Sequence, residues 1–134
     1  VGDDRPVSDI AAVVKELQSA GKVGTVGYCW GGTLSFLAGT RVDGVAASVV
    51  YYGGQIVPYK DEAAQAPIQM HFGDMDAGIP MEDVNQIKEA QPQADVHIYH
   101  ADHGFNCDHR SQYDEESCTI ARQRTLAFFT EYVG

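Results

Sequence analysis

The segment 27–31 (Gly-Tyr-Cys-Trp-Gly) has residue types and spacing suited to chemistry, because Cys29 stands between two glycines in a G-x-C-x-G pattern. An apolar run that begins at Val23 ends here, and residues 33–38 favour a helix, which indicates a strand-to-helix junction. This is the nucleophile-elbow pattern, with cysteine where serine is more usual. A buried structural cysteine is the alternative, since an unpaired cysteine often packs as a small hydrophobic residue.

The tight turn of an elbow explains why its glycines are spaced in this way. A nucleophile raised above a sheet forces its own backbone into a strained conformation, and we expect a positive φ at Cys29. Side chains two residues away on either side should collide with the turn, so Gly27 and Gly31 are expected to be required. The following helix would present its N-terminal amides and dipole to the thiol, which should therefore ionise more easily than usual.

A thiolate nucleophile also needs a base, and the base needs a group that orients it. In open α/β sheets such groups lie in the loops at the carboxyl ends of the strands. Two loops offer them: residues 73–80 contain Asp74 and Asp76, and residues 100–105 contain His103. The order nucleophile, acid, histidine is that of hydrolases with a nucleophile elbow.

Each partner also has a simpler interpretation. Asp76 could be a solvated loop residue or a helix cap, because it lies just before the helix expected at Pro80, and His103 could be an ordinary loop histidine. A zinc site is the competing chemistry, since imidazole and thiolate are good zinc ligands, although the spacing fits no zinc pattern. Its candidate ligands are His97, His100, His103, Cys107 and His109.

Three motifs taken together resemble the dienelactone hydrolase (carboxymethylenebutenolidase) family, which has the α/β-hydrolase fold. They are Gly-Tyr-Cys-Trp-Gly-Gly at 27–32, Gly73-x-x-Asp76 followed by Pro80, and His103-Gly104-Phe105. The later Tyr113-Asp114 and Phe128-Phe129 pairs are similar to that family too. The motifs occur in the order found in the family, and the similarity extends over essentially the whole chain.

The resemblance implies a Cys-His-Asp triad that acts on a small-molecule ester or lactone through an acyl-enzyme. Cys29 matches the nucleophile, His103 the base and Asp76 the orienting acid, while the glycine-x-x-aspartate spacing selects Asp76 over Asp74. The backbone N–H of Trp30 would be one oxyanion donor. No cofactor and no metal ion are implied.

The sequence departs from the family pattern at its start. Family members carry an N-terminal half with the first strands of the sheet, which supplies a second oxyanion amide and a glutamate that helps to activate the thiol. This chain resembles only the C-terminal portion, so a missing N-terminal half or self-association could complete it. The alternative function is a non-catalytic fragment or association module. Family arginines hold a substrate carboxylate, but Arg110 matches none of their positions, so the substrate stays open.

Composition narrows the class of protein and its partners. The chain has 134 residues, and a single α/β-hydrolase-like domain is expected over residues 1–134. A net charge of −10 argues against nucleic acid or an anionic membrane surface as partner. No apolar run reaches transmembrane length, and the three cysteines lack a disulfide pattern, so a cytoplasmic location is expected.

Elements that could position the site residues alternate along the chain. Strands are expected at 23–28, 45–52, 68–72 and 95–99, and helices at about 33–40, 80–90 and from 114 onward. Residues 1–7 read as turn-like, with Ser8 or Asp9 capping a first helix whose apolar stripe is Ile10, Val13, Val14 and Leu17.

These elements predict an α/β fold with a mostly parallel sheet that lacks the N-terminal strands of the full hydrolase fold. Only four strands are expected, so the first strand should leave a sheet edge for something else to cover.

Overall fold

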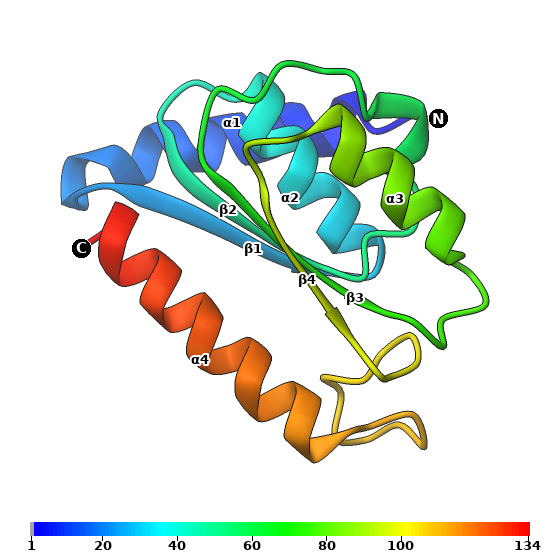
Figure 1. Cartoon of the computed structure of the whole chain (residues 1–134). Helices are drawn as coiled ribbons and strands as arrows, with labels where there is room; N and C mark the ends of the chain where they lie inside the picture. The colour runs from blue at the N-terminus through cyan, green and yellow to red at the C-terminus, as the bar shows by residue number, and fades with distance from the viewer. Residues whose placement is uncertain (1) are drawn as a thin grey trace.

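Four strands form one parallel sheet in the order β1-β2-β3-β4 in the computed structural model, which describes residues 2–134 (Figure 1). The strands are β1 (Val23–Tyr28), β2 (Val45–Tyr51), β3 (Ile68–Gly73) and β4 (Asp95–Tyr99). The helices are α1 (Asp4–Leu17), α2 (Trp30–Arg41), α3 (Met81–Ala90) and α4 (Glu115–Tyr132), with short 3₁₀ turns η1 (Gln18–Ala20) and η2 (Val57–Tyr59). The predicted α/β class and all four predicted strands are confirmed.

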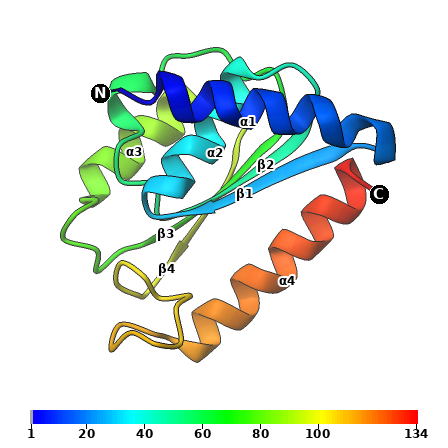
Figure 2. The ribbon, with the colours of Figure 1, turned by 180° about the vertical axis from the view of Figure 1, so that it is seen from behind.

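The helices lie on both faces of the sheet, with α1, α2 and α3 on one face and α4 on the other (Figures 1 and 2). The central strands β2 and β3 are therefore covered twice, and nearly all of their residues are buried. This explains why their sequences show little alternation of apolar and polar residues. The parallel order also brings the carboxyl ends of all four strands to one edge of the sheet.

The last helix, α4, begins at a capped end. The side chain of Asp114 accepts a 2.8 Å hydrogen bond from the Ser117 amide, which satisfies one of the free donors of the first turn. Ala121, Thr125 and Phe128 are buried, so the face of α4 that carries them packs against the sheet.

The first helix begins earlier than predicted. α1 starts at Asp4 with Asp3 as its N-cap residue, so the predicted cap at Ser8 or Asp9 is wrong and residues 4–7 are helical; Val1 lies outside the described residues. Pro6 is tolerated because it sits in the first turn, where amide groups have no partner within the helix.

The outer edge of β1 is left open by residues 2–134, as the sequence predicted. Among the strands of the described residues, β1 pairs with β2 alone. Of the predicted apolar stripe on α1, Val14 is buried, but Val13 and Leu17 are 56% and 49% exposed. Val26 on β1 is also exposed. Apolar side chains on α1 and on the unpaired edge strand β1 are therefore left exposed.

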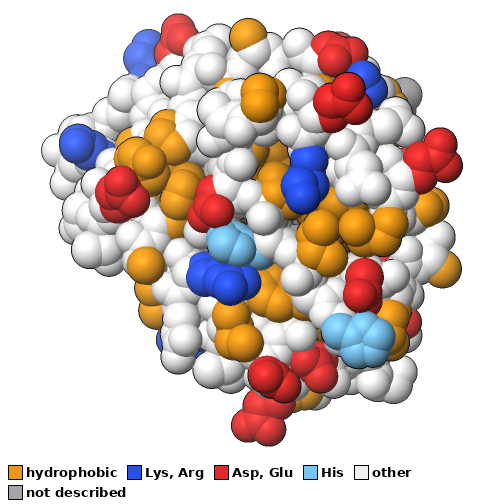
Figure 3. All heavy atoms as spheres, in the orientation of Figure 1, with side chains coloured by type: hydrophobic (Ala, Val, Ile, Leu, Met, Phe, Trp, Pro, Cys, Tyr) orange, Lys and Arg blue, Asp and Glu red, His pale blue; other side chains and the backbone are white. Residues whose placement is uncertain are grey.

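The acidic excess does not gather in one place on the face drawn in Figure 3, where Asp and Glu side chains are spread among hydrophobic ones. Within residues 2–134, no helix combines the length and the apolar character that crossing a bilayer requires.

A fully buried histidine lies at the contact between the sheet and α4. His71 Nδ1 is 2.8 Å from the Tyr99 hydroxyl, and Nε2 is 2.9 Å from Oε1 of Gln69. The Gln69 amide nitrogen donates to Asp95, so Oε1 must accept and Nε2 of His71 carries the proton. Arg124 donates to the Tyr99 hydroxyl, which leaves that hydroxyl free to donate to Nδ1. Burial lowers the pKa of His71 to about 3.

We predict that acid destabilises this fold through His71. The unfolded chain binds a proton near the ordinary histidine pKa of about 6.5, whereas the folded chain does not, so stability falls as pH drops below that value. The contribution is at most about 1.4 kcal/mol per pH unit. Urea unfolding between pH 7 and 4 measures it. His71→Gln should flatten the slope, and the exposed-site control His109→Gln should leave it unchanged.

Candidate active site

The turn between β1 and α2 has the geometry of a nucleophile elbow. Cys29 has φ 56° and ψ −123°, so the predicted positive φ is confirmed. The Cys29 amide donates to the Tyr51 carbonyl at 3.1 Å, and the Cys29 carbonyl accepts from Gly32 at 2.9 Å. These bonds to β2 and α2 hold the strained residue in place.

Two glycines make this turn sterically feasible, but they are not the predicted pair. A Cβ atom at Gly27 would overlap the carbonyl group of Gly31. At Gly32 a Cβ atom would lie 2.6 Å from the Tyr51 carbonyl oxygen. A Cβ atom added at Gly31 would have no atom of residues 2–134 in steric contact within 4 Å. The predicted requirement at Gly31 is therefore wrong, because the close approach involves its carbonyl rather than its Cα.

His103 and Asp76 meet at the carboxyl end of the sheet, from the loops that follow β4 and β3. His103 Nδ1 lies 2.7 Å from Asp76 Oδ2, and the Asp76 side chain is 1% exposed. Its other oxygen accepts from the amides of Gly78 and Ile79 at 2.9 and 3.2 Å. A carboxylate fixed in this way keeps the proton on Nδ1 and leaves His103 Nε2 able to accept one.

The competing carboxylate takes a different partner. Asp74 lies 3.1 Å from the exposed His100 side chain, so of the two acids in this loop Asp76 is the one that contacts His103.

Cys29 lines a pocket of about 360 Å³ together with Tyr28, Tyr52, Cys107 and Arg110. The centres of the Tyr52 and His103 rings are 4.9 Å apart, so Tyr52 contacts the histidine as well as lining the pocket of Cys29. Cys29 Sγ makes no hydrogen bond within residues 2–134. The thiol and the His103–Asp76 pair therefore lie near one aromatic residue, and no hydrogen bond joins Sγ to the imidazole within residues 2–134.

The expectation that Cys29 ionises easily is wrong. Burial raises the pKa of the Cys29 thiol, with a smaller opposing effect from the Arg110 guanidinium. The charges of Asp76 and Cys107 raise this pKa further. The thiol is therefore protonated at rest, and forming the thiolate requires a base.

Amide donors lie beside the thiol at the start of α2. The Gly32 and Thr33 amides donate to the Cys29 carbonyl. The Trp30 and Gly31 amides have no acceptor among residues 2–134. A free amide on the residue after a nucleophile can stabilise negative charge on a substrate oxygen.

The histidines of the segment proposed for zinc do not converge. Each pairs with a different carboxylate, and within the described residues no three His, Cys, Asp or Glu side chains form a group that could hold a metal ion. The pairs are His97–Asp95, His100–Asp74, His103–Asp76 and His109–Asp108.

Sequence reasoning did not assign a role near the elbow to Asp3, Tyr28 or Cys107. Tyr28 and Cys107 line the Cys29 pocket, and Asp3 accepts a hydrogen bond from the indole of Trp30. Tyr28 lies inside the elbow motif and could have been suspected. No local signal marks Asp3, which is distant from the elbow in sequence.

Comparisons with known proteins agree on one family. A model described as "Dienelactone hydrolase family" matches residues 2–133. A Synechocystis protein described as a carboxymethylenebutenolidase is 32% identical over 92% of this chain and 58% of its own length. The crystal structure of a Klebsiella pneumoniae protein described as a dienelactone hydrolase matches with a TM-score of 0.90 at 29% identity, over 98% of this chain and 63% of that one.

A more distant match extends the likeness of fold. A Pyrococcus furiosus esterase has a TM-score of 0.78 at 14% identity, over 98% of this chain and 63% of its own. The chain spans about half the length of the curated relatives it matches.

We predict that Gly27→Ala and Gly31→Ala have opposite effects. The first places a methyl group against backbone and should destabilise the fold by about 2 kcal/mol or more. The second adds a methyl group in open space within a helix and should stabilise it by about 0.5–1 kcal/mol. Urea unfolding of both variants measures this. Equal losses would contradict the steric account of the elbow.

We also predict that iodoacetamide alkylates Cys29 with a pH midpoint above the ordinary cysteine value of about 8.5. Arg110→Ala should move the midpoint higher, because the guanidinium lowers the pKa of this thiol. Peptide mass spectrometry separates Cys29 from Cys107 and Cys118. A wild-type midpoint near neutrality would refute the effect of burial.

Proposed function

Because the chain belongs to the dienelactone hydrolase family, we propose that it carries the catalytic triad of a carboxylic ester or lactone hydrolase. Cys29 is the nucleophile, His103 the general base and Asp76 the acid that orients it. The observation that carries this proposal is the 2.7 Å contact between the buried Asp76 carboxylate and His103 Nδ1, near the pocket that holds Cys29. No cofactor takes part in the proposed reaction.

The reaction begins with transfer of the Cys29 proton to His103 Nε2. The thiolate attacks the ester carbonyl, and the Trp30 amide donates to the resulting oxyanion. The C–O bond to the leaving alkoxide then breaks, and His103 returns the proton to it. Water, deprotonated by His103, hydrolyses the thioester and releases the carboxylic acid and Cys29. Asp76 stabilises the imidazolium in both steps.

The resting thiol makes the base necessary. Since burial raises the pKa of Cys29, neutral pH does not supply thiolate, and the proposed reaction requires His103 to accept the thiol proton. Tyr52 contacts the His103 ring and lines the pocket, so its ring lies beside both the base and the nucleophile. Arg110 brings a positive charge to the pocket, which favours substrates that carry a negative charge.

The second candidate function is an association module, and the open edge of β1 favours it. β-α-β crossovers between parallel strands are right-handed, and α1 lies on the same face of the sheet as α2 (Figures 1 and 2). A strand that preceded α1 would therefore lie on the free side of β1. We propose that polypeptide of this kind, N-terminal to α1, covers the exposed Val13, Leu17 and Val26 side chains.

A burst assay with p-nitrophenyl acetate tests the catalytic proposal. Wild-type protein should release about one equivalent of p-nitrophenol rapidly, and Cys29→Ala should abolish the burst. His103→Ala should slow acylation by about 10³-fold or more, because the base is lost. Cys29→Ser should also weaken activity.

The matched control is His100→Ala, which removes a histidine paired with the surface Asp74 and should act like wild type. Equal rates for the His103 and His100 variants would remove the triad assignment. A folded wild-type chain without a burst would favour the association module.

A further inference from the structure

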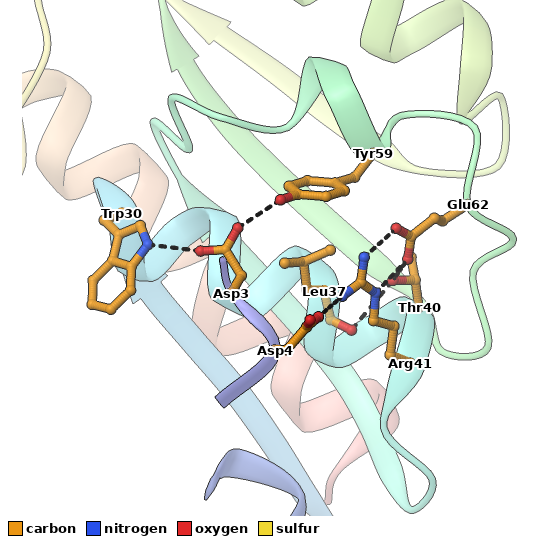
Figure 4. Close-up of polar contacts among 8 residues, drawn as sticks. All are labelled: Asp3, Asp4, Trp30, Leu37, Thr40, Arg41, Tyr59 and Glu62. Atoms are coloured by element: carbon orange, nitrogen blue, oxygen red, sulfur yellow. Dashed lines mark hydrogen bonds and ion pairs between the residues drawn. The ribbon is translucent and has the colours of Figure 1, made fainter. Parts of the chain in front are cut away.

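A single carboxylate links the elbow to two other parts of the chain. Asp3 Oδ1 accepts a 3.1 Å hydrogen bond from the indole N–H of Trp30, and Oδ2 accepts a 2.8 Å hydrogen bond from the Tyr59 hydroxyl. Figure 4 shows Asp3 between the two rings. The N-terminus of α1, the elbow and η2 therefore meet at one buried side chain.

The Asp3 side chain does not cap the helix that it precedes. It occupies the N-cap position of α1, yet its side chain makes no capping hydrogen bond. The third residue of this helix is Pro6, which has no N–H to offer. Both oxygens of Asp3 are instead used on residues distant in sequence.

Trp30 depends on this contact more than a core tryptophan would. It directly follows Cys29, its side chain is 54% exposed, and it is not among the described hydrophobic residues that pack on the core. The hydrogen bond to Asp3 therefore restrains an indole that packing leaves free.

The Tyr59 side of the contact is itself held. The Arg41 guanidinium lies 5.2 Å from the centre of the Tyr59 ring, and two of its nitrogens donate to the Glu62 carboxylate at 2.9 and 2.7 Å (Figure 4). Asp3 therefore links Trp30 to Tyr59, whose ring is itself in contact with the Arg41 guanidinium.

We propose that Asp3 is a positioning residue for the oxyanion donor. By restraining the indole of Trp30, it fixes the peptide group between Cys29 and Trp30, whose N–H would stabilise the oxyanion. This inference rests on the proposed hydrolase function. A strained backbone persists only when its surroundings over-determine it, and Asp3 supplies one such restraint from outside the elbow.

Trp30 is the single tryptophan of the chain, so its fluorescence reports on this contact directly. Asp3→Ala should raise the acrylamide quenching constant of Trp30 about twofold. It should slow acylation by p-nitrophenyl acetate about tenfold, since misplaced catalytic groups lose rate steeply. Alkylation of Cys29 by iodoacetamide forms no oxyanion, so its rate should stay within about twofold of wild type.

Asp3→Asn provides the conservative rescue, because its Oδ1 can accept from the indole and its amide can donate to the Tyr59 oxygen. It should stay within about threefold of wild type in acylation. Asp4→Ala is the matched control, since the Asp4 side chain is 97% exposed and its ion pair within residues 2–134 is with Arg41, at 3.5 Å. It should leave all three readouts unchanged.

Trp30→Phe removes the donor from the other side and keeps the inference testable if Asp3→Ala does not fold. It should slow acylation as Asp3→Ala does, and the double variant should be no slower than either single variant. Unchanged quenching in Asp3→Ala, equal losses of acylation and alkylation, or multiplying losses in the double variant would each overturn the inference. If wild type itself shows no acylation, the hydrolase proposal fails, and the quenching data still decide whether Asp3 restrains Trp30.

Discussion

The strained backbone of Cys29 is the constraint on which the rest of the structure depends. A residue with φ 56° requires that β1 end and α2 begin within one turn, so that Gly27 meets the Gly31 carbonyl and Gly32 meets β2. No side chain fits at Gly27 or Gly32. Hydrogen bonds to β2 and the contact of Trp30 with Asp3 then hold a conformation that the isolated segment would not keep.

The same turn explains why the thiol is partly buried and is not ionised at rest. The elbow directs Cys29 into a pocket lined by Tyr28 and Tyr52, and loss of water there raises the pKa of the thiol more than Arg110 lowers it. A helix N-terminus and a nearby cation are therefore insufficient to make this cysteine reactive at rest.

The parallel sheet concentrates the candidate site in a chain about half as long as its curated relatives. Cys29, Asp76 and His103 follow β1, β3 and β4, whose carboxyl ends share one edge, so this sheet by itself carries all three residues of the proposed triad. β1 is also the edge strand of this sheet, and its outer side has no partner strand within the described residues. Val26 on β1 and Val13 and Leu17 on the neighbouring α1 are exposed there.

The sequence by itself determined the α/β class, the four strands and the elbow, because these depend on local apolar periodicity and on glycine spacing. It also indicated Cys29, Asp76 and His103 through their motifs, and the structure brings the last two into contact. Only the tertiary structure decided the start of α1, since the Asp3 carboxylate is used by Trp30 and Tyr59, which are remote in sequence. It alone decided that Gly32 rather than Gly31 is required, because β2 provides the clashing atom. The pKa of Cys29 also depended on it, because desolvation is set by side chains from distant strands and loops that close around the thiol.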